Sequence, residues 1–373
     1  MKHGHKLEHV LAAVRPAVRQ TWAYRVGGAE NILVKLNQNE SPFDLPDDLK
    51  KELVEAYLST PFNRYPNIQP HQLRKALAAR LDWDEDGVLV GNGSNELCAA
   101  AVAAIVERET PVVLPRPMFG YFDALARLFD GSVHEVSPRS DLSFDAAALL
   151  AAVCKVKPAL TILTTPNNPT GMSMPIEEIE PIVAASAGIV VVDEAYLEFT
   201  EETSAFTILE RYPNLLLLRT FSKAYGLAGL RVGYLVGHKI LIAEISKARP
   251  PFMTDRLVEL TALKLLENPE LTQERINYIK REAKRLERSL ASMDSVEPLP
   301  SQSNFVTFTT PIDATELMDR LAARGVMVRN MSGYRELIGY LRVSAGLESE
   351  NNIFIVELKA ALKNGSMTPT SLP

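Results

Sequence analysis

The stretch that decides how this chain folds is Leu215-Leu-Leu-Leu-Arg-Thr-Phe-Ser-Lys-Ala-Tyr-Gly-Leu-Ala-Gly-Leu-Arg-Val-Gly-Tyr234. It opens with a continuous apolar run that is typical of a buried strand, and Lys223 stands five residues after Leu218. A lysine just past a buried strand is poorly solvated, so its pKa falls and the neutral amine, which attacks aldehydes, becomes available. Taken alone, such a lysine is more often a surface residue, so the interpretation depends on its neighbours. Arg231, eight residues further on, offers a rigid fork suited to a phosphate.

Short apolar runs alternate with helical patterns through the middle of the chain. The expected strands cover residues 87–90, 111–114, 161–164, 189–192 and 215–218. The expected helices between them cover residues 96–107, 121–129 and 176–185. Continuous apolar strands separated by helices are typical of a mostly parallel sheet that is covered on both faces. The sequence therefore predicts an α/β fold.

The character of the sequence changes after about residue 247. A long helix is predicted by the 3-4-3-4 spacing of the apolar residues Ile276, Ile279, Ala283, Leu286 and Leu290. Strands with better alternation follow at 304–308 and 340–344, which is typical of a smaller α+β domain. We therefore expect three parts, namely an N-terminal segment that packs with the small domain, a large domain and a small C-terminal domain, with the boundaries 1–35, 36–250 and 251–373.

Polar groups follow the two strands that precede Leu215 in the sequence. Asp193 ends the run at 189–192, and the turn-forming cluster at 165–171 would hold Asn168 at the same edge of the sheet. Ligands of open α/β sheets bind at the carboxyl ends of the strands. A buried carboxylate such as Asp193 needs a partner, and the pyridine nitrogen of pyridoxal phosphate, which must stay protonated, is such a partner. Tyr196 could donate a hydrogen bond to the phenolic oxygen of the same ring.

A phosphate site is predicted at Val88-Leu-Val-Gly-Asn-Gly-Ser-Asn-Glu96, which combines a strand, a glycine turn and a helix start. Backbone amides at a helix N-terminus bind phosphate well. A dinucleotide-binding fold is disfavoured, because Glu96 replaces the third glycine of G-x-G-x-x-G and the next strand ends in Pro115 instead of an acidic ribose ligand. No G-K-[ST] sequence is present, which disfavours ATP.

Together these segments resemble the fold-type I, class II aminotransferases that depend on pyridoxal phosphate, and they are most similar to the histidinol-phosphate aminotransferase family. The resemblance runs from about residue 37 to residue 346 and rests on Asn-Asn-Pro-Thr-Gly, Asp-Glu-Ala-Tyr and Ser-Lys-Ala-Tyr-Gly-Leu-Ala-Gly-Leu-Arg, in that order and spacing. It implies that Lys223 holds the cofactor as a Schiff base, that Asp193 binds the ring nitrogen, and that the phenolic oxygen is held by Asn168 and Tyr196. It also implies that the cofactor phosphate is bound by Gly93, Ser94, Asn95, Ser222 and Arg231.

The resemblance further implies contacts to the face of the ring and between subunits. Phe119 would stack on the pyridine ring, with Tyr121 as the other candidate. Tyr65, in Asn63-Arg-Tyr-Pro66, would reach the phosphate of the neighbouring subunit's cofactor. This last contact implies a homodimer.

Two arginines in the expected small domain bear on the substrate. From the residues alone, Arg342 and Arg329 are either members of ion pairs or an anion clamp. By the resemblance, Arg342 binds the α-carboxylate of an amino acid, whereas Arg329 and Tyr24 contact the phosphate of histidinol phosphate. The segments Trp22-Ala-Tyr24 and Leu36-Asn-Gln-Asn-Glu-Ser-Pro42 differ from the family's common pattern, and both lie where the substrate side chain is expected.

The resemblance implies a transfer of an amino group between L-histidinol phosphate and 2-oxoglutarate, giving imidazole acetol phosphate and L-glutamate, in histidine biosynthesis. An aromatic amino acid aminotransferase shares every cofactor residue and stays an alternative. A lyase similar to threonine-phosphate decarboxylases is another, and it would release carbon dioxide instead of consuming 2-oxoglutarate. A regulator that merely binds pyridoxal phosphate would need a DNA-binding segment, which neither the short N-terminus nor the acidic charge offers.

Composition argues against several other classes of protein. The net charge is −6 over 373 residues, which disfavours a nucleic-acid partner. No apolar run approaches the roughly 18 residues that cross a membrane, and none near the N-terminus is long enough for a signal peptide, so we expect a cytoplasmic protein. Cys98 and Cys154 suit a reducing compartment. The histidines His3, His5 and His9 lie in a charged terminal segment without partner ligands, so no metal is expected.

Overall fold

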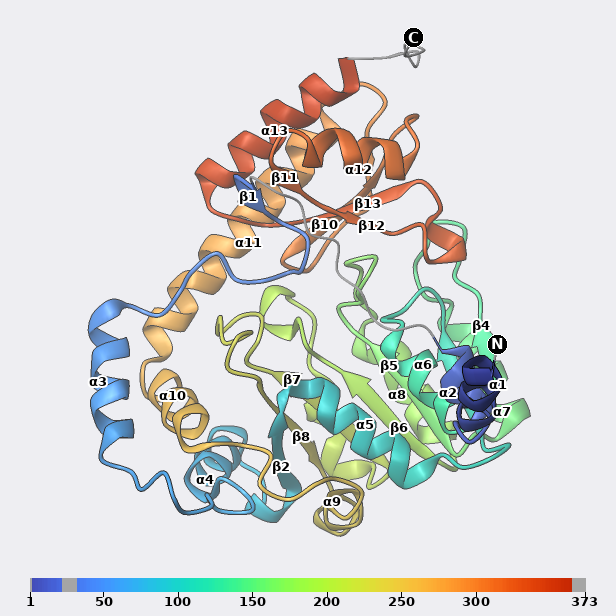
Figure 1. Cartoon of the computed structure of the whole chain (residues 1–373), viewed down its shortest axis with the longest axis vertical. Coiled ribbons are helices and arrows are strands. Elements are labelled where there is room, and N and C mark those ends of the chain that lie inside the picture. The colour runs from blue at the N-terminus through green and yellow to red at the C-terminus, as the bar shows by residue number, and fades with distance from the viewer. Residues whose placement is uncertain (1, 22–31, 364–373) are drawn as a thin grey trace.

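A computed structural model of the chain describes residues 2–21 and 32–363. Its centre is a seven-stranded sheet with the strand order β2-β8-β7-β6-β5-β3-β4 (Figure 1). The strands are β2 (Val88–Asn92), β3 (Pro111–Pro115), β4 (Ser132–Val136), β5 (Leu160–Thr164), β6 (Ile189–Asp193), β7 (Leu215–Thr220) and β8 (Val232–Gly237). Within this sheet β8 runs antiparallel to its neighbours β2 and β7, and the remaining ladders are parallel. The predicted α/β fold with a mostly parallel sheet is confirmed.

Helices cover both faces of this sheet, as its continuous apolar strands require. One face carries α5 (Gly93–Ile105), α6 (Tyr121–Leu128) and α9 (Lys239–Ser246), and the other carries α7 (Ala146–Val156) and α8 (Ile176–Ala185). The chain reverses its direction across the sheet at β4. With crossovers of the usual right hand, this reversal is expected to place the connecting helices before and after β4 on opposite faces. The strands β5, β7 and β8 are buried along their whole length, so the core lies on both sides of the sheet.

A second, antiparallel sheet has the order β12-β13-β10-β9 and lies above the first in Figure 1. Its strands are β9 (Glu297–Pro298), β10 (Phe305–Thr309), β12 (Arg329–Asn330) and β13 (Tyr340–Ser344). The helices α11 (Pro269–Ala291), α12 (Ala314–Ala322) and α13 (Glu348–Lys363) pack around it. The apolar stripe predicted for the long helix is confirmed, because all five of its residues are buried in α11.

Segments from both ends of the chain surround the two sheets. Next to the small sheet, β1 (Val34–Lys35) pairs in parallel with β11 (Val326–Met327). Beside the large sheet, α3 (Asp47–Leu58) and α4 (His71–Leu81) pack against α10 (Arg256–Glu267). The short 3-10 helices are η1 (Glu85–Gly87), η2 (Leu197–Phe199), η3 (Ala205–Arg211) and η4 (Arg335–Leu337).

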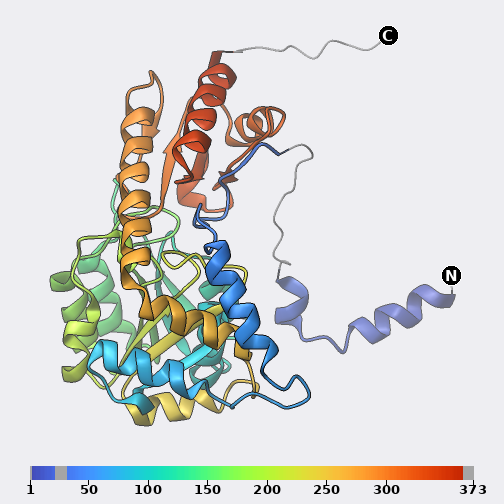
Figure 2. The same cartoon turned by 90° about the vertical axis from the view of Figure 1, so that its left-hand side faces the viewer.

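The N-terminal helices are α1 (Lys2–Leu11) and α2 (Pro16–Gln20). The second of them lies against α6 of the large sheet, and Figure 2 shows α1 extending away from the body of the molecule. The expected packing of residues 1–35 with the small domain, and the domain boundaries, stay predictions.

Two strands of the large sheet are absent from the pattern of apolar runs. The edge strand β4 pairs with β3 alone among the described strands and exposes alternate residues, so it lacks a continuous apolar run. The strand β8 is interrupted by two glycines, Gly233 and Gly237. Gly233 is required by close packing, because a Cβ there would lie 2.6 Å from the Ser94 amide nitrogen.

Candidate active site

The register of three parallel strands places the predicted site residues at one edge of the large sheet. The strands β5 and β6 end level with each other, where Thr164 pairs with Asp193, and β7 runs beside them. The loops that follow these three strands carry Asn168, Tyr196 and Lys223. The structure therefore brings together groups that lie up to 55 residues apart in the sequence.

Lys223 lies partly buried between the large sheet and the segment after β1. Its Nζ donates a hydrogen bond to the Gln38 carbonyl oxygen at 3.2 Å and lies 5.7 Å from the centre of the Tyr196 ring. Burial, with the nearby Arg342 guanidinium, lowers the pKa of Lys223 to about 8. The charged ammonium form is thus destabilised relative to the nucleophilic neutral amine.

Asp193 is a buried carboxylate in this site that could bind a positively charged group. The side chain is buried, and its Oδ1 accepts a hydrogen bond from the Ala195 amide at 3.0 Å. Burial raises the pKa of Asp193 to about 7; the neighbouring Glu194 adds to this rise, whereas the Ala195 amide and Lys223 oppose it. A protonated nitrogen of an aromatic ring against this carboxyl group would stabilise its ionised form.

Two amide side chains hold the hydroxyl group of Tyr196. Asn39 Nδ2 donates to it at 3.0 Å and Asn168 Nδ2 at 3.3 Å. Burial raises the pKa of Tyr196 to about 12, so the phenol stays protonated and can donate to one further acceptor. The sequence did not predict a role for Asn39. The feature that could have pointed to it is the run of amide side chains Asn37-Gln-Asn39, which lies in the segment where the substrate site is expected.

The N-terminus of α5 forms a cradle with Arg231. Gly93 adopts a left-handed φ of +73°, and a Cβ there would lie 2.5 Å from Arg231 Nη2. Arg231 Nη1 also donates to the Ser222 hydroxyl at 3.4 Å. Ser94 and Asn95 follow in the first turn of α5. A guanidinium, a hydroxyl and the first amides of a helix are donors suited to a phosphate.

These groups fit pyridoxal phosphate part by part. The lowered pKa of Lys223 suits an amine that attacks the aldehyde, and the buried Asp193 suits the ring nitrogen. The Tyr196 hydroxyl and Asn168 lie together as a pair of donors for the phenolic oxygen, and the cradle at Gly93 would take the phosphate. The role of each of these residues toward the cofactor stays a prediction from the sequence.

Arg329 and Arg342 lie directly opposite each other on the neighbouring strands β12 and β13. Arg342 is buried, and its guanidinium donates to the Asn168 side-chain oxygen and, at 3.1 Å, to the Asn37 carbonyl oxygen. The Arg342 guanidinium carbon also lies 5.2 Å from the centre of the Phe305 ring. The Arg342 side chain of the small sheet thus contacts Asn168, in the loop that follows β5 of the large sheet. Two neighbouring guanidinium groups favour ligands with more than one negative charge.

The other predicted residues are placed less closely. The rings of Phe119 and Tyr121 lie side by side with their centres 6.1 Å apart, so both stay candidates for stacking. Tyr65 is 78% exposed and stacks on Phe252, with ring centres 4.5 Å apart. Tyr24 lies outside the described residues.

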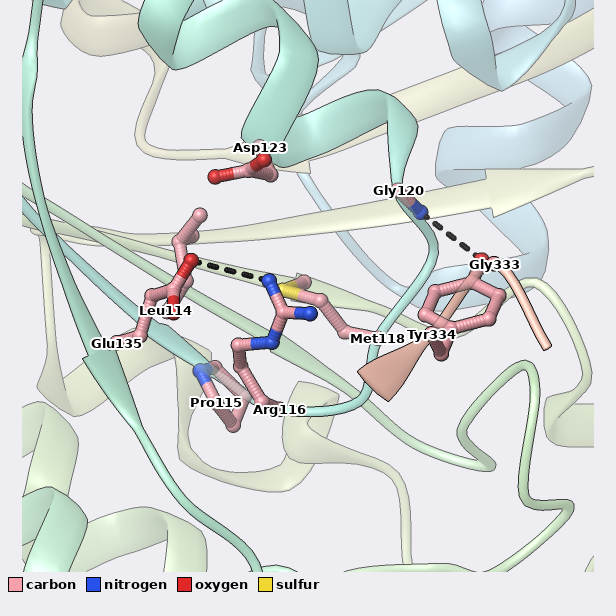
Figure 3. A pocket seen from close by; sticks show the side chains of 9 residues that line it. All are labelled: Leu114, Pro115, Arg116, Met118, Gly120, Asp123, Glu135, Gly333 and Tyr334. Atoms are coloured by element: carbon pink, nitrogen blue, oxygen red, sulfur yellow. Dashed lines mark hydrogen bonds and ion pairs between the residues drawn. The ribbon is translucent and has the colours of Figure 1, made fainter. Parts of the chain in front are cut away.

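A cavity of about 130 Å³ lies at the end of β3, between the large sheet and the loop after β12 (Figure 3). The residues that line it are Leu114, Pro115, Arg116, Met118, Gly120, Asp123, Glu135, Gly333 and Tyr334. Across the described part of the chain, no group of three or more His, Cys, Asp or Glu residues could hold a metal ion. None of the described helices is long and apolar enough to cross a membrane.

Comparisons with known proteins agree with this geometry. The family model for aminotransferase class I and II matches residues 31–357, and the chain therefore belongs to the class I and II aminotransferase family. The histidinol-phosphate aminotransferase of Chlorobaculum tepidum is 41% identical over 346 residues, which are 93% of this chain and 99% of that protein.

Solved structures of similar fold include aminotransferases of the same name. The histidinol-phosphate aminotransferase of Sinorhizobium meliloti, solved in complex with pyridoxal-5'-phosphate, is 27% identical with a TM-score of 0.85, covering 94% of this chain and 98% of that one. A putative histidinol-phosphate aminotransferase from Erwinia carotovora is 26% identical with a TM-score of 0.83, covering 91% of this chain and 99% of that one. The resemblance and the fold-type I architecture predicted from the sequence are both confirmed.

The lowered pKa of Lys223 predicts how its reaction with an aldehyde depends on pH. Because the neutral amine is the nucleophile, the rate at which cofactor-free protein binds pyridoxal phosphate covalently should rise with pH and level off above about 8, well below the ordinary lysine value of 10.5. Stopped-flow absorbance between about pH 6 and pH 10 measures this rate. Arg342→Met should move the midpoint upward, because Arg342 helps to lower the pKa. A wild-type rate that keeps rising through the ordinary lysine range would contradict the shift.

Proposed function

We propose that the protein is a pyridoxal-phosphate-dependent aminotransferase that transfers an amino group between L-histidinol phosphate and 2-oxoglutarate, giving imidazole acetol phosphate and L-glutamate, in histidine biosynthesis. The observation that carries this proposal is the meeting of Lys223, Asp193 and Tyr196 at adjacent strand ends, next to Arg342 of the small sheet. The 41% identity to a histidinol-phosphate aminotransferase over nearly the whole chain supports the choice of substrate.

The chain's own residues supply the acid–base chemistry of this reaction. When bound, pyridoxal phosphate supplies an electron sink for negative charge that develops at the substrate α-carbon. Lys223, as an amine of lowered pKa, would accept and return the proton at that α-carbon. Asp193 keeps the ring nitrogen protonated, and Tyr196 with Asn168 orients the phenolic oxygen. The burial of Asp193 and Tyr196 limits their contact with water and strengthens their interactions.

The substrates explain why two arginines are needed. Histidinol phosphate carries a phosphate and no carboxylate, whereas glutamate carries two carboxylates, and one site must bind both amino donors in turn. Arg342 would take the α-carboxylate, and Arg329 with Tyr24 would take the phosphate or the second carboxylate. The pairing of Arg329 with Arg342 on adjacent strands supports a shared role of these two residues in binding such small dianions.

We also propose a cytoplasmic homodimer in which Tyr65 binds the cofactor phosphate of the neighbouring subunit. The loop and helix around Tyr65 carry large exposed apolar side chains, with Leu58 67% exposed, Phe62 68% and Ile68 64%. Several exposed apolar side chains in one segment suit a subunit interface. The free cysteines Cys98 and Cys154 suit a reducing compartment.

The amino donor can be identified from the absorbance of the bound cofactor. We expect histidinol phosphate to convert the loaded enzyme to its amino form at a far lower concentration than phenylalanine, with glutamate also effective and threonine phosphate releasing no carbon dioxide. Equal conversion by phenylalanine, with poor conversion by histidinol phosphate, would favour the aromatic aminotransferase. Release of carbon dioxide from threonine phosphate would favour the lyase.

Replacement of Arg329 by Gln should separate the phosphate contact from the rest of the site. A charge-assisted hydrogen bond contributes about 1.5–3 kcal/mol, so the KM for histidinol phosphate should rise about 10- to 100-fold while the KM for phenylalanine changes little. Arg324→Gln is the matched control, because Arg324 pairs with Glu357 of α13 at 2.9 Å. Steady-state kinetics with both donors measure the effect. Equal rises for both donors would show that Arg329 does not bind the phosphate.

The shared site can be tested by mixing two inactive subunits. Lys223→Ala removes the amine, and Tyr65→Ala removes the proposed contact to the partner's cofactor. In a hybrid dimer one site would lack both groups, whereas the other would keep Lys223 and receive the intact Tyr65. Activity should therefore reappear on mixing by denaturation and refolding. No recovery, with dimers present by gel filtration, would show that Tyr65 acts within its own subunit.

A further inference from the structure

The loop between β12 and β13 reaches from the small sheet to the large one. At its tip the Tyr334 hydroxyl accepts a hydrogen bond from the Gly120 amide at 3.3 Å (Figure 3). Gly120 directly follows Phe119, a candidate for stacking on the cofactor, and stands at the start of α6. Tyr334 is also among the groups that affect the pKa of Tyr196, so its hydroxyl lies within electrostatic range of the candidate active site.

Ion pairs fasten the same loop to the large sheet on the other side of the cavity. Arg116 Nε pairs with Glu336 at 3.2 Å, and Arg335 Nη1 pairs with Glu135 of β4 at 3.3 Å. Each side of this junction also holds a pair of its own, Arg116 with Glu135 at 3.0 Å at the large sheet and Arg335 with Glu336 at 2.6 Å within η4. Two residues of the loop thus form one network of alternating charges with Arg116 after β3, Glu135 of β4 and Arg127 of α6, which pairs with Glu135 at 2.9 Å.

The pair of Arg116 with Glu336 is more enclosed than an ordinary surface ion pair, whereas the side chain of Arg335 is 57% exposed. The side chain of Glu336 is 10% exposed and that of Arg116 is 20% exposed. Burial alone would raise the pKa of Glu336, but the guanidinium groups of Arg335 and Arg116 hold it below its usual range. Charges screened from water in this way interact more strongly than exposed ones, so the loop has a defined position on the large sheet.

The loop also connects the two proposed substrate arginines. Arg329 lies five residues before Tyr334, at the start of β12, and Arg342 lies eight residues after it, in the middle of β13, where the two pair across the ladder. The loop tip that contacts Gly120 is therefore continuous with the two strands that carry the proposed substrate arginines. The hydrogen bond between the Gly120 amide and the Tyr334 hydroxyl joins uncharged groups of the loop and the large sheet. Gly120 lies next to Phe119 in the sequence.

We propose that Tyr334 is a positioning residue for amino transfer, and that its hydrogen bond to Gly120 sets the distance between the arginines of the small sheet and the cofactor site of the large one. The inference rests on the proposed roles of Arg329 and Arg342 in binding the anionic ends of the substrates. A tyrosine that serves packing alone would need its ring and not its hydroxyl, and this difference makes the proposal testable.

Tyr334→Phe removes the hydroxyl and keeps the ring. The KM for glutamate and the KM for histidinol phosphate should each rise about 3- to 10-fold, the range expected for one hydrogen bond, with kcat changed less than about twofold. Succinate, an unreactive dicarboxylate, should bind to the loaded enzyme with a dissociation constant raised by a similar factor, measured by calorimetry. Tyr340→Phe is the matched control, since Tyr340 begins β13, pairs with Thr309 of β10 and has Glu297 of β9 as the charge that affects the pKa of its phenol, and it should leave all these values unchanged.

The succinate and glutamate measurements separate this proposal from the proposed function. If the wild-type enzyme rejects histidinol phosphate, the substrate assignment fails, and the other two ligands still test Tyr334. Unchanged KM and dissociation constants in Tyr334→Phe would overturn the proposal. So would a lower melting temperature or a lower kcat with no change in binding, because these results would assign the hydroxyl to stability or to the chemical step.

Discussion

The level ending of the parallel strands β5 and β6, beside β7, is the constraint on which the rest of the site depends. It arises from backbone hydrogen bonding alone, through the pairing of Thr164 with Asp193 and the continuation of that ladder into β7. Because parallel strands deliver their following loops to the same edge, a carboxyl group, a phenol and an amine meet there without any local sequence relation. Helices on both faces bury the strands, and that burial changes the acid–base properties of the groups at their ends.

Burial moves the two central titratable groups toward each other on the pH scale. The pKa of Lys223 falls to about 8 and that of Asp193 rises to about 7, in both cases because the charged form is poorly solvated. In the proposed reaction the lowered pKa of Lys223 supplies a neutral amine. The ionised form of Asp193 would be stabilised by a protonated ring nitrogen of the cofactor. The Tyr196 phenol, with its raised pKa, stays a donor over the same pH range.

The sequence was sufficient to predict the features that depend on local pattern. Continuous apolar runs predicted β3, β5, β6 and β7 within two residues of their bounds, and the helix at 176–185 agrees with α8 at both ends. The family motifs pointed to Lys223, Asp193 and Asn168, which the structure brings to one edge of the sheet. These predictions succeed because strand burial and the turn chemistry of a motif are both properties of neighbouring residues.

Contacts between distant segments could not be predicted in this way. The bond from Asn39 to Tyr196 joins residues 157 positions apart, and that from Gly120 to Tyr334 joins residues 214 positions apart. The sequence around Asn39 or Tyr334 contains no local pattern from which its hydrogen-bond partner could be predicted. The strand β8 was also missed, because its glycines, which close packing requires, interrupt the apolar run by which strands are recognised. The features that the sequence did not predict therefore depend on contacts between segments far apart in the chain.

The most direct test of the central claim is to locate the lysine that reacts with pyridoxal phosphate. Purified protein would be incubated with the cofactor, reduced with borohydride, digested and mapped by mass spectrometry, with Lys223→Arg as the control. Labelling of Lys223 in the wild type, and its absence from the variant, is the predicted result. Stoichiometric labelling at another lysine would contradict the account, because the strand-end arrangement would then not be the cofactor site.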